Sequence, residues 1–268
     1  MDYFYSIILA AVQGLTEFLP ISSSGHLIIL HQIFPSELLN SLTFDVVLHF
    51  GTLIALVIFF WRDLIKLTKG FFLSIFKKSS KTEHYLSWYI IVSLIPASAI
   101  GYFFEDLIEQ KFRSTNAVIV MLVVVGILFI IFEKIRSKKR ELVSMTLVDA
   151  LIIGLAQVLS FIPGTSRSGI TIVGGLARGF SRKEAARFSF LMAIPVLFFA
   201  FIKRITQISL SDSSFSFVFV CILGTIISAV VGYVVIKYFL RFLEKRSLVV
   251  FAVYRFILAA ILLIVFVL

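Results

Sequence analysis

Long apolar runs with few charged residues recur along the whole chain and are separated by short polar connectors. A helix needs roughly 20 apolar residues to cross the roughly 30 Å hydrocarbon core of a bilayer. Most of the runs reach that length, although the fourth is shorter. The pattern therefore predicts an all-α polytopic membrane protein with about six transmembrane helices. The runs cover residues 42–61, 85–104, 116–132, 188–202, 216–236 and 247–268.

Two further apolar stretches, residues 3–19 and 147–162, are interrupted by short polar segments that begin at Pro20 and Pro163. Each polar segment is followed by an apolar stretch that is too short to span a bilayer comfortably. Non-helical backbone at membrane depth is tolerated only where protein or a water-filled cavity surrounds it. We therefore predict two re-entrant helical hairpins whose polar tips meet inside the membrane.

The two interrupted stretches belong to an internal repeat. Shifting the sequence against itself by about 144 positions aligns Gln13 with Gln157, and the Ser-x-Ser-Gly motif that begins at Ser22 with the motif at Ser166. An odd number of predicted spans separates corresponding helices, so the two halves are expected to have inverted topology. We predict a single integral membrane domain, residues 1–268, with repeats at about 1–133 and 145–268.

Composition and charge agree with a membrane location. Hydrophobic residues make up 60% of the chain and charged residues 15%, whereas about 25% of the residues in a soluble domain are charged. The net charge of +10 falls mainly in short connectors near residues 62–81, 134–140 and 237–246. Short basic loops are typical of the cytoplasmic side and attract anionic lipid. We therefore expect contact with membrane lipid and none with nucleic acid.

The first polar tip gathers a carboxylate, hydroxyls and an imidazole in a short stretch. Gln13 and Glu17 are four residues apart and share a helix face, and a carboxylate inside a membrane is a candidate functional group. His26 follows three serines, which favour the start of a helix. The tip therefore supplies candidate groups for catalysis and substrate binding. These candidates are Gln13, Glu17, Ser22, Ser23, Ser24, Gly25 and His26.

The second polar tip is suited to binding an anion. Arg167 carries a permanent charge and a forked set of donors that match phosphate oxygens, and backbone amides at a helix N-terminus also bind anions. Together, the two tips indicate hydrolysis of a phosphate ester or anhydride. ATP is not the expected substrate, because the GxxxxGK[ST] motif is absent. The candidates in this tip are Gly164, Thr165, Ser166, Arg167, Ser168 and Gly169.

The segments QGLTEFLPISSSGH (residues 13–26) and PGTSRSGIT (residues 163–171) resemble the two signature motifs of undecaprenyl-diphosphate phosphatases of the bacitracin-resistance type. The resemblance extends over the full chain. It implies hydrolysis of undecaprenyl diphosphate to undecaprenyl phosphate and inorganic phosphate, which recycles the lipid carrier of peptidoglycan synthesis and confers bacitracin resistance. It also implies dependence on Mg²⁺ or Ca²⁺, the bacterial plasma (inner) membrane, and an active site open to the outer face.

The first motif often begins with glutamate in that family, whereas this chain has Gln13. We therefore expect Glu17 to be the essential carboxylate and the ligand of the divalent cation. Arg167 and the loop amides are expected to hold the diphosphate and to neutralise the charge that develops during phosphoryl transfer. His26 is expected to be the general base. The nucleophile is either Ser23, through a phosphoseryl intermediate, or water, and the sequence leaves both open.

Other polar residues in the apolar runs receive structural interpretations. Asp45 and His49, four residues apart, are expected to form a structural ion pair, and a supporting role in catalysis is the less favoured interpretation. Arg255 lies two turns into the last run, where its side chain can extend to the interface; contact with substrate is the less favoured interpretation.

A transporter of polyprenyl phosphate or another anion is the alternative function, because inverted repeats and interrupted helices are typical of transporters. Anion transport alone does not require the combination of Glu17, Ser23, His26 and Arg167. The oligomeric state stays open, with a homodimer as one option.

Overall fold

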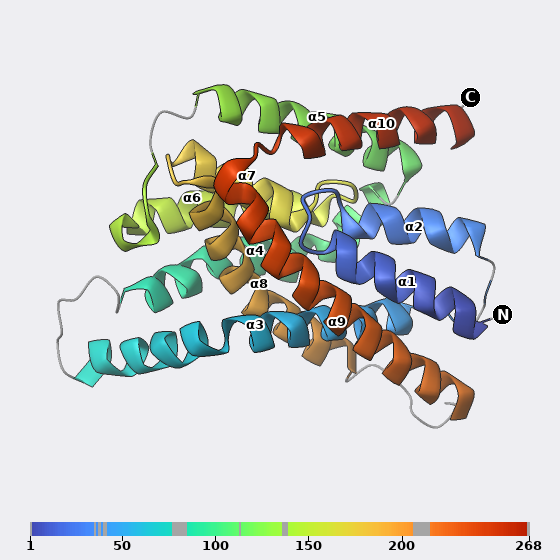
Figure 1. Ribbon diagram of the computed structural model, residues 1–268, viewed down its shortest axis with the longest axis horizontal. Helices are drawn as coiled ribbons and strands as arrows, with labels where there is room; N and C mark the ends of the chain where they lie inside the picture. Colours follow the sequence, from blue (N-terminus) through green and yellow to red (C-terminus); the bar gives the residue numbers. More distant parts are fainter. Residues whose placement is uncertain are drawn as a thin grey trace.

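The computed structural model shows a bundle of helices (Figure 1). It describes residues 2–34, 36, 39, 42–76, 85–112, 114–135, 139–205 and 215–266. Within these residues the structure contains α-helices, two short 3-10 helices (η2, Leu142–Ser144, and η3, Leu159–Phe161) and one isolated β-bridge. The α-helices are α1 (Asp2–Thr16), α2 (Ser23–Ile33), α3 (Leu42–Phe76), α4 (Leu86–Phe112), α5 (Thr115–Ile135), α6 (Leu147–Val158), α7 (Arg167–Ala177), α8 (Arg182–Ile205), α9 (Phe215–Lys245) and α10 (Val249–Phe266).

Six of these helices, α3, α4, α5, α8, α9 and α10, are long and apolar enough to cross a membrane. Each covers all or most of one of the predicted apolar runs, so the prediction of an all-α polytopic membrane protein is confirmed. The helices extend beyond several of the runs into polar sequence. For example, α3 continues to Phe76 beyond non-helical backbone angles at Phe60. The helix α8 is longer than the run at residues 188–202, because it begins earlier, at Arg182, in charged sequence.

The helices α1 and α2, and likewise α6 and α7, form the two hairpins. They contain 15, 11, 12 and 11 residues, which corresponds to lengths of about 16–23 Å, less than the roughly 30 Å of hydrocarbon. In Figure 1 the hairpins enter from opposite sides and their tips meet in the middle of the bundle. The arrangement is that of two re-entrant hairpins.

The long helices form the frame around the hairpins. The helix α9 packs along α1 and α3, α6 packs against α4, α7 against α8, and α5 against α10. Small residues allow close approach: a Cβ atom at Gly51 would collide with Ser228, and one at Gly154 would collide with the backbone of Ser93. Beside the first tip, Phe18 is fully buried and packs edge-on against Phe190. The hairpin tips are therefore supported by closely packed helices.

Candidate active site

Ser22 and Ser166 precede the second helix of each hairpin and share an unusual backbone conformation. Their φ angles are 75° and 70°, in the left-handed region that residues other than glycine rarely adopt. Each hydroxyl accepts a hydrogen bond from an amide three residues later, that of Gly25 at 3.2 Å and that of Gly169 at 3.1 Å. These corresponding positions of the predicted repeat therefore have the same local structure, while the repeat over the whole chain stays a prediction.

The two capped helices bring two N-termini to the centre of the bundle. The first-turn amides of a helix have no intrahelical acceptor, and a helix N-terminus attracts anions. In α2 this turn begins at Ser23, and in α7 it begins at Arg167. The tips therefore offer backbone donors from both halves of the chain, as the sequence predicted for the second tip.

The other residues predicted to bind substrate make hydrogen bonds and close contacts within and between the two hairpin tips. The hydroxyls of Ser22 and Ser24 are 3.4 Å apart, and those of Ser166 and Ser168 are 3.1 Å apart. Ser168 also donates to the carbonyl of Leu19 at 3.3 Å, a bond between the hairpins. Two further residues shape the second turn. Thr165 donates to the carbonyl of Ile162 at 2.7 Å, and Gly164 has a φ of 91° with no room for a side chain beside Val118.

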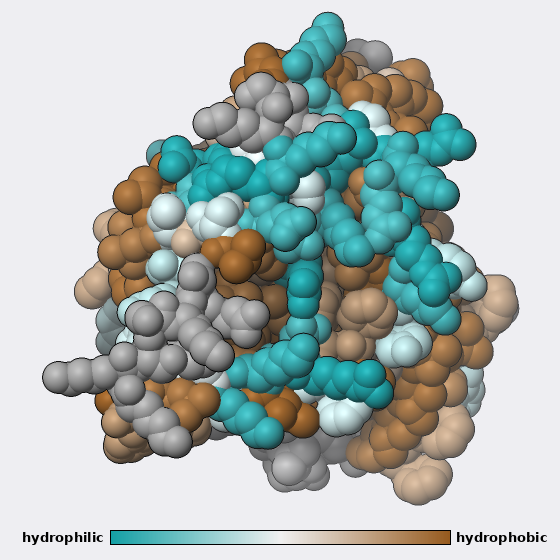
Figure 2. Space-filling model, turned by 60° about the vertical axis from the view of Figure 1, so that its left-hand side comes forward, coloured by the Kyte–Doolittle hydropathy of each residue, from teal (hydrophilic) through white to brown (hydrophobic). Residues whose placement is uncertain are grey.

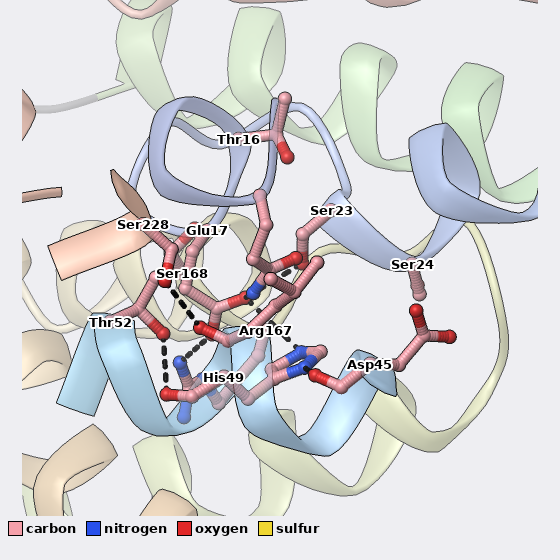
Figure 3. A network of polar contacts seen from close by, with 12 residues as sticks. Thr16, Glu17, Ser23, Ser24, Asp45, His49, Thr52, Arg167, Ser168 and Ser228 are labelled. Atoms are coloured by element: carbon pink, nitrogen blue, oxygen red, sulfur yellow. Dashed lines mark hydrogen bonds and ion pairs between the residues drawn. The ribbon is translucent and has the colours of Figure 1, made fainter. Parts of the chain in front are cut away.

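Glu17 lies at the centre of the site and connects the two hairpins (Figure 3). Its Oε1 accepts a hydrogen bond from Arg167 Nη2 at 2.5 Å. Its Oε2 accepts from Ser23 Oγ at 2.8 Å and from Gln13 Nε2 at 2.9 Å. The glutamate is only 7% exposed, so its charge is balanced mainly by Arg167 and these donors. The structure thus brings three of the four predicted catalytic residues into direct contact.

His26, the fourth predicted catalytic residue, makes its contacts elsewhere. Its Nδ1 lies 2.7 Å from the carbonyl oxygen of Ser22, and its Nε2 lies 2.7 Å from the hydroxyl of Tyr254. A carbonyl can only accept, so Nδ1 carries a proton, and in the neutral ring Nε2 then accepts from Tyr254. The two rings are also stacked. The hydroxyl of Ser23 bonds to Glu17 instead, so the geometry does not place His26 as the base for Ser23.

His49 joins the site in a way that differs from the sequence prediction. Its Nδ1 donates to the backbone carbonyl of Asp45 at 2.8 Å, and its Nε2 lies 3.5 Å from Glu17 Oε2. The carboxylate of Asp45 pairs with His31 at 2.9 Å. The predicted Asp45–His49 ion pair is therefore wrong, because α2 supplies a nearer partner for Asp45. The rule that ionisable residues inside a span are functional candidates identifies His49 as readily as Glu17.

The interpretation of Arg255 as a residue that extends to the interface is also wrong. Its side chain is fully buried and donates to backbone carbonyls of both tips, including those of Pro20 at 3.1 Å and Gly164 at 2.8 Å. The hydropathy of α10 gave no sign of these acceptors, because both are distant in sequence.

The donor set around Glu17 fits a divalent cation only in part. Within the described ranges, no group of three His, Cys, Asp or Glu side chains is placed to hold a metal ion. Oxygen atoms that could bind a cation here are the carboxylate of Glu17 and Oε1 of Gln13, a buried atom without a hydrogen-bond partner among the residues that the structure describes. Mg²⁺ commonly binds through one or two carboxylates together with substrate phosphates and water. The residues present fit that mode.

The chain is similar to known proteins over almost its whole length. The family "Bacitracin resistance protein BacA" matches residues 6–261. The undecaprenyl-diphosphatase of Saccharophagus degradans is 42% identical over 264 residues, which cover 97% of each chain. Those of Moorella thermoacetica and Geotalea daltonii are 41% and 43% identical, over 99% and 95% of this chain and 98% and 95% of their own. A match of this extent shows that the chain belongs to the bacitracin resistance protein BacA family.

Proposed function

We propose that the protein hydrolyses undecaprenyl diphosphate to undecaprenyl phosphate and inorganic phosphate. The observation that carries the proposal is the contact of Glu17 with Ser23 and Arg167, which come from two hairpins enclosed by apolar helices. The relatives named undecaprenyl-diphosphatase support the same substrate. The reaction would recycle the lipid carrier of peptidoglycan synthesis and confer resistance to bacitracin.

Substrate binding falls to Arg167 and to the amides at the N-termini of α2 and α7. The guanidinium has five N–H donors, and its bond to Glu17 leaves donors for phosphate oxygens. These positive and dipolar groups stabilise the charge that develops on the transferred phosphoryl group, which is the main contribution a protein makes to this chemistry. The apolar spans would hold the polyprenyl chain in the membrane.

Proton transfer is assigned to Glu17. When Ser23 is the nucleophile, its Oγ gives its proton to Glu17 and bonds to the terminal phosphorus. The bond from that phosphorus to the bridging oxygen breaks, and undecaprenyl phosphate leaves. Water then cleaves the phosphoserine and releases inorganic phosphate. When water is the nucleophile, it takes the place of the Ser23 hydroxyl beside Glu17. The assignment moves the base role from His26 to Glu17, and His26 holds the backbone of the first tip.

We also propose that the reaction requires a divalent cation, on the basis of the oxygen atoms of Glu17 and Gln13 described above. Glu17 and Gln13 would hold a Mg²⁺ or Ca²⁺ ion together with the phosphate oxygens of the substrate. A bound cation would supply charge neutralisation for the phosphoryl group. Glu17, Ser23 and Arg167 supply the remaining chemistry.

The placement in the bacterial plasma membrane is proposed from the family, and the opening of the site to the outer face is proposed from the family together with the distribution of charge. Hydrophilic residues gather on one end of the molecule (Figure 2), formed by the ends of α3 and α9 and the start of α8. Arginine and lysine predominate in these segments, as expected on the cytoplasmic side. A homodimer remains an expectation. The transport alternative gains no support from the relatives, which are named for hydrolysis.

The test is release of inorganic phosphate from C15 and C55 polyprenyl diphosphates by the purified protein in detergent. We expect release with Mg²⁺ or Ca²⁺ and little release after chelation. A folded protein that releases no phosphate with either cation contradicts the proposal, and transport of the lipid phosphate in vesicles would then be measured.

A further inference from the structure

Arg255 is a cation that is completely buried inside the protein, on the transmembrane helix α10. Its guanidinium donates to backbone carbonyls, and the centroid of the Phe129 ring lies 5.9 Å from the guanidinium carbon. Burying a charged group is expensive unless its hydrogen bonds are satisfied. The acceptors are the carbonyls of Pro20 (3.1 Å), Met121 (2.9 Å), Leu122 (3.1 Å), Gly164 (2.8 Å) and Thr165 (3.2 Å).

These acceptors belong to three separate segments. Pro20 lies in the first tip, two residues before Ser22, the residue with positive φ. Gly164 and Thr165 lie in the second tip, directly before Ser166, the corresponding residue with positive φ. The other two acceptors lie in α5. One planar guanidinium therefore fixes the two tips to each other and to the frame.

Two further contacts connect the tips: the ion pair between Glu17 and Arg167 and the hydrogen bond from Ser168 to the carbonyl of Leu19. If Arg167 binds the diphosphate, as the proposed function requires, that ion pair weakens when substrate arrives. The carbonyl oxygens bonded to Arg255 differ from the groups assigned to the substrate, which are the Arg167 guanidinium and backbone amides. The bonds of Arg255 can therefore hold the tips in place while the reaction proceeds.

We propose that Arg255 is the positioning residue that locks the two hairpin tips together, so that Ser23 and Glu17 of one tip meet Arg167 of the other. The measurement of kcat rests on the proposed hydrolysis, whereas the structural part of the inference does not. A displacement of about 1 Å in a catalytic site costs about 10²-fold in rate. A loosened joint between the tips should therefore affect turnover strongly, although Arg255 itself does not touch the substrate.

The test compares Arg255→Lys and Arg255→Met with the wild type. Lysine keeps the charge, but one ammonium group has three donors and lacks the planar fork needed to reach three segments. We expect both variants to lose about 10²-fold in kcat. Hydrogen–deuterium exchange without substrate should accelerate together at amides of both tips, namely those of Gly25, His26, Gly169 and Ile170. These amides bond to Ser22 or Ser166 in the structure.

Arg246→Lys is the matched control, because Arg246 is exposed at the end of α9; its kcat and tip exchange should equal those of the wild type. Near-normal kcat in Arg255→Lys would show that charge suffices and would overturn the proposal. Loss of kcat with unchanged tip exchange, or faster exchange spread evenly over all helices, would also overturn it. Hydrogen–deuterium exchange is measured without substrate, so it tests whether Arg255 holds the tips together even if the proposed reaction is wrong.

A second variant covers the case in which the Arg255 variants do not fold. Glu17→Gln removes the ion pair between the tips but keeps Arg255 and the hydrogen bond from Ser168 to Leu19. If Arg255 is the main lock, the tip amides of Glu17→Gln stay protected to within about two-fold of the wild type, because local opening reflects the contacts that remain. Strongly faster exchange at both tips in this variant would mean that the Glu17–Arg167 pair is the lock instead.

Discussion

Replacing Glu17 with glutamine removes the negative charge at the centre of the site and keeps the size of the side chain. In the wild type this carboxylate is 2.8 Å from the Ser23 hydroxyl and 2.5 Å from Arg167. A positioned general base contributes about 10²–10⁴-fold to a rate. We therefore expect kcat to fall by about 10³-fold, or about 4 kcal/mol of transition-state stabilisation, in a steady-state assay of phosphate release.

The same substitution should have the opposite effect on anion binding. Glu17 competes with the diphosphate for the guanidinium of Arg167, and a hydrogen bond to a charged group contributes about 1.5–3 kcal/mol. Removing the competitor should therefore tighten the binding of a non-hydrolysable methylene analogue of farnesyl diphosphate by about tenfold or more. The dissociation constant is measured by calorimetry in the presence of a chelator, because a cation held by Glu17 would mask the effect.

Glu244→Gln provides a matched control. Glu244 pairs with Lys183 at the hydrophilic end of the molecule, so its loss should change neither kcat nor the affinity for the analogue. Two results would refute the reasoning about Glu17. One is a kcat within a few-fold of the wild type, and the other is weaker binding of the analogue by Glu17→Gln without any cation.

Three further substitutions test separate parts of the structure. Ser23→Ala should abolish nearly all phosphate release if Ser23 is the nucleophile, whereas activity within a few-fold of the wild type means that water attacks directly. His49→Gln removes the imidazole 3.5 Å from Glu17 and should lower kcat by about tenfold, well short of the loss expected for a general base; an unchanged kcat would leave His49 without a role. Burial by itself raises the pKa of Asp149, but hydrogen bonds from Arg140 and Arg178 outweigh burial and lower it to about 2. Because this pKa is depressed on folding, the stabilisation is complete above about pH 4 and is lost as the pH falls toward 2. Asp149→Asn should therefore cost about 2 kcal/mol at pH 7 and show a flatter acid unfolding curve, as measured by thermal unfolding in detergent; an acid unfolding curve identical to that of the wild type would contradict this assignment.

The parts of the structure that the sequence predicts are those governed by local chemistry. Apolar length is enough to identify spans such as α5 and α9, because hydrocarbon thickness sets the length of a crossing helix. The hairpin tips are equally local. Ser22 and Ser166 cap helices that begin at the next residue, and proline and glycine mark the turns before them.

The contacts that the sequence could not predict join segments that are distant in the chain. Helical spacing correctly places Asp45 and His49 on one face of α3, but it does not show which side chains face them. Their actual partners, His31 and Glu17, come from the neighbouring hairpin. The same holds for His26, whose partner Tyr254 lies 228 residues away. Such pairings depend on how helices cross, and the hydropathy pattern does not specify that.

The charges at the two tips explain why a divalent cation suits the proposed reaction. Glu17 carries one negative charge and Arg167 and Arg255 carry one positive charge each, so the three sum to +1. A single phosphate monoester group already carries about −1.5 to −2 at neutral pH, and a diphosphate carries at least as much. Unbalanced charge is costly in a site enclosed by apolar helices, so a bound diphosphate needs further positive charge. With the neutral Gln13 in place of a second carboxylate, the protein alone offers a weak cation site. We therefore expect the cation to be held mainly by the diphosphate and to enter the site with it.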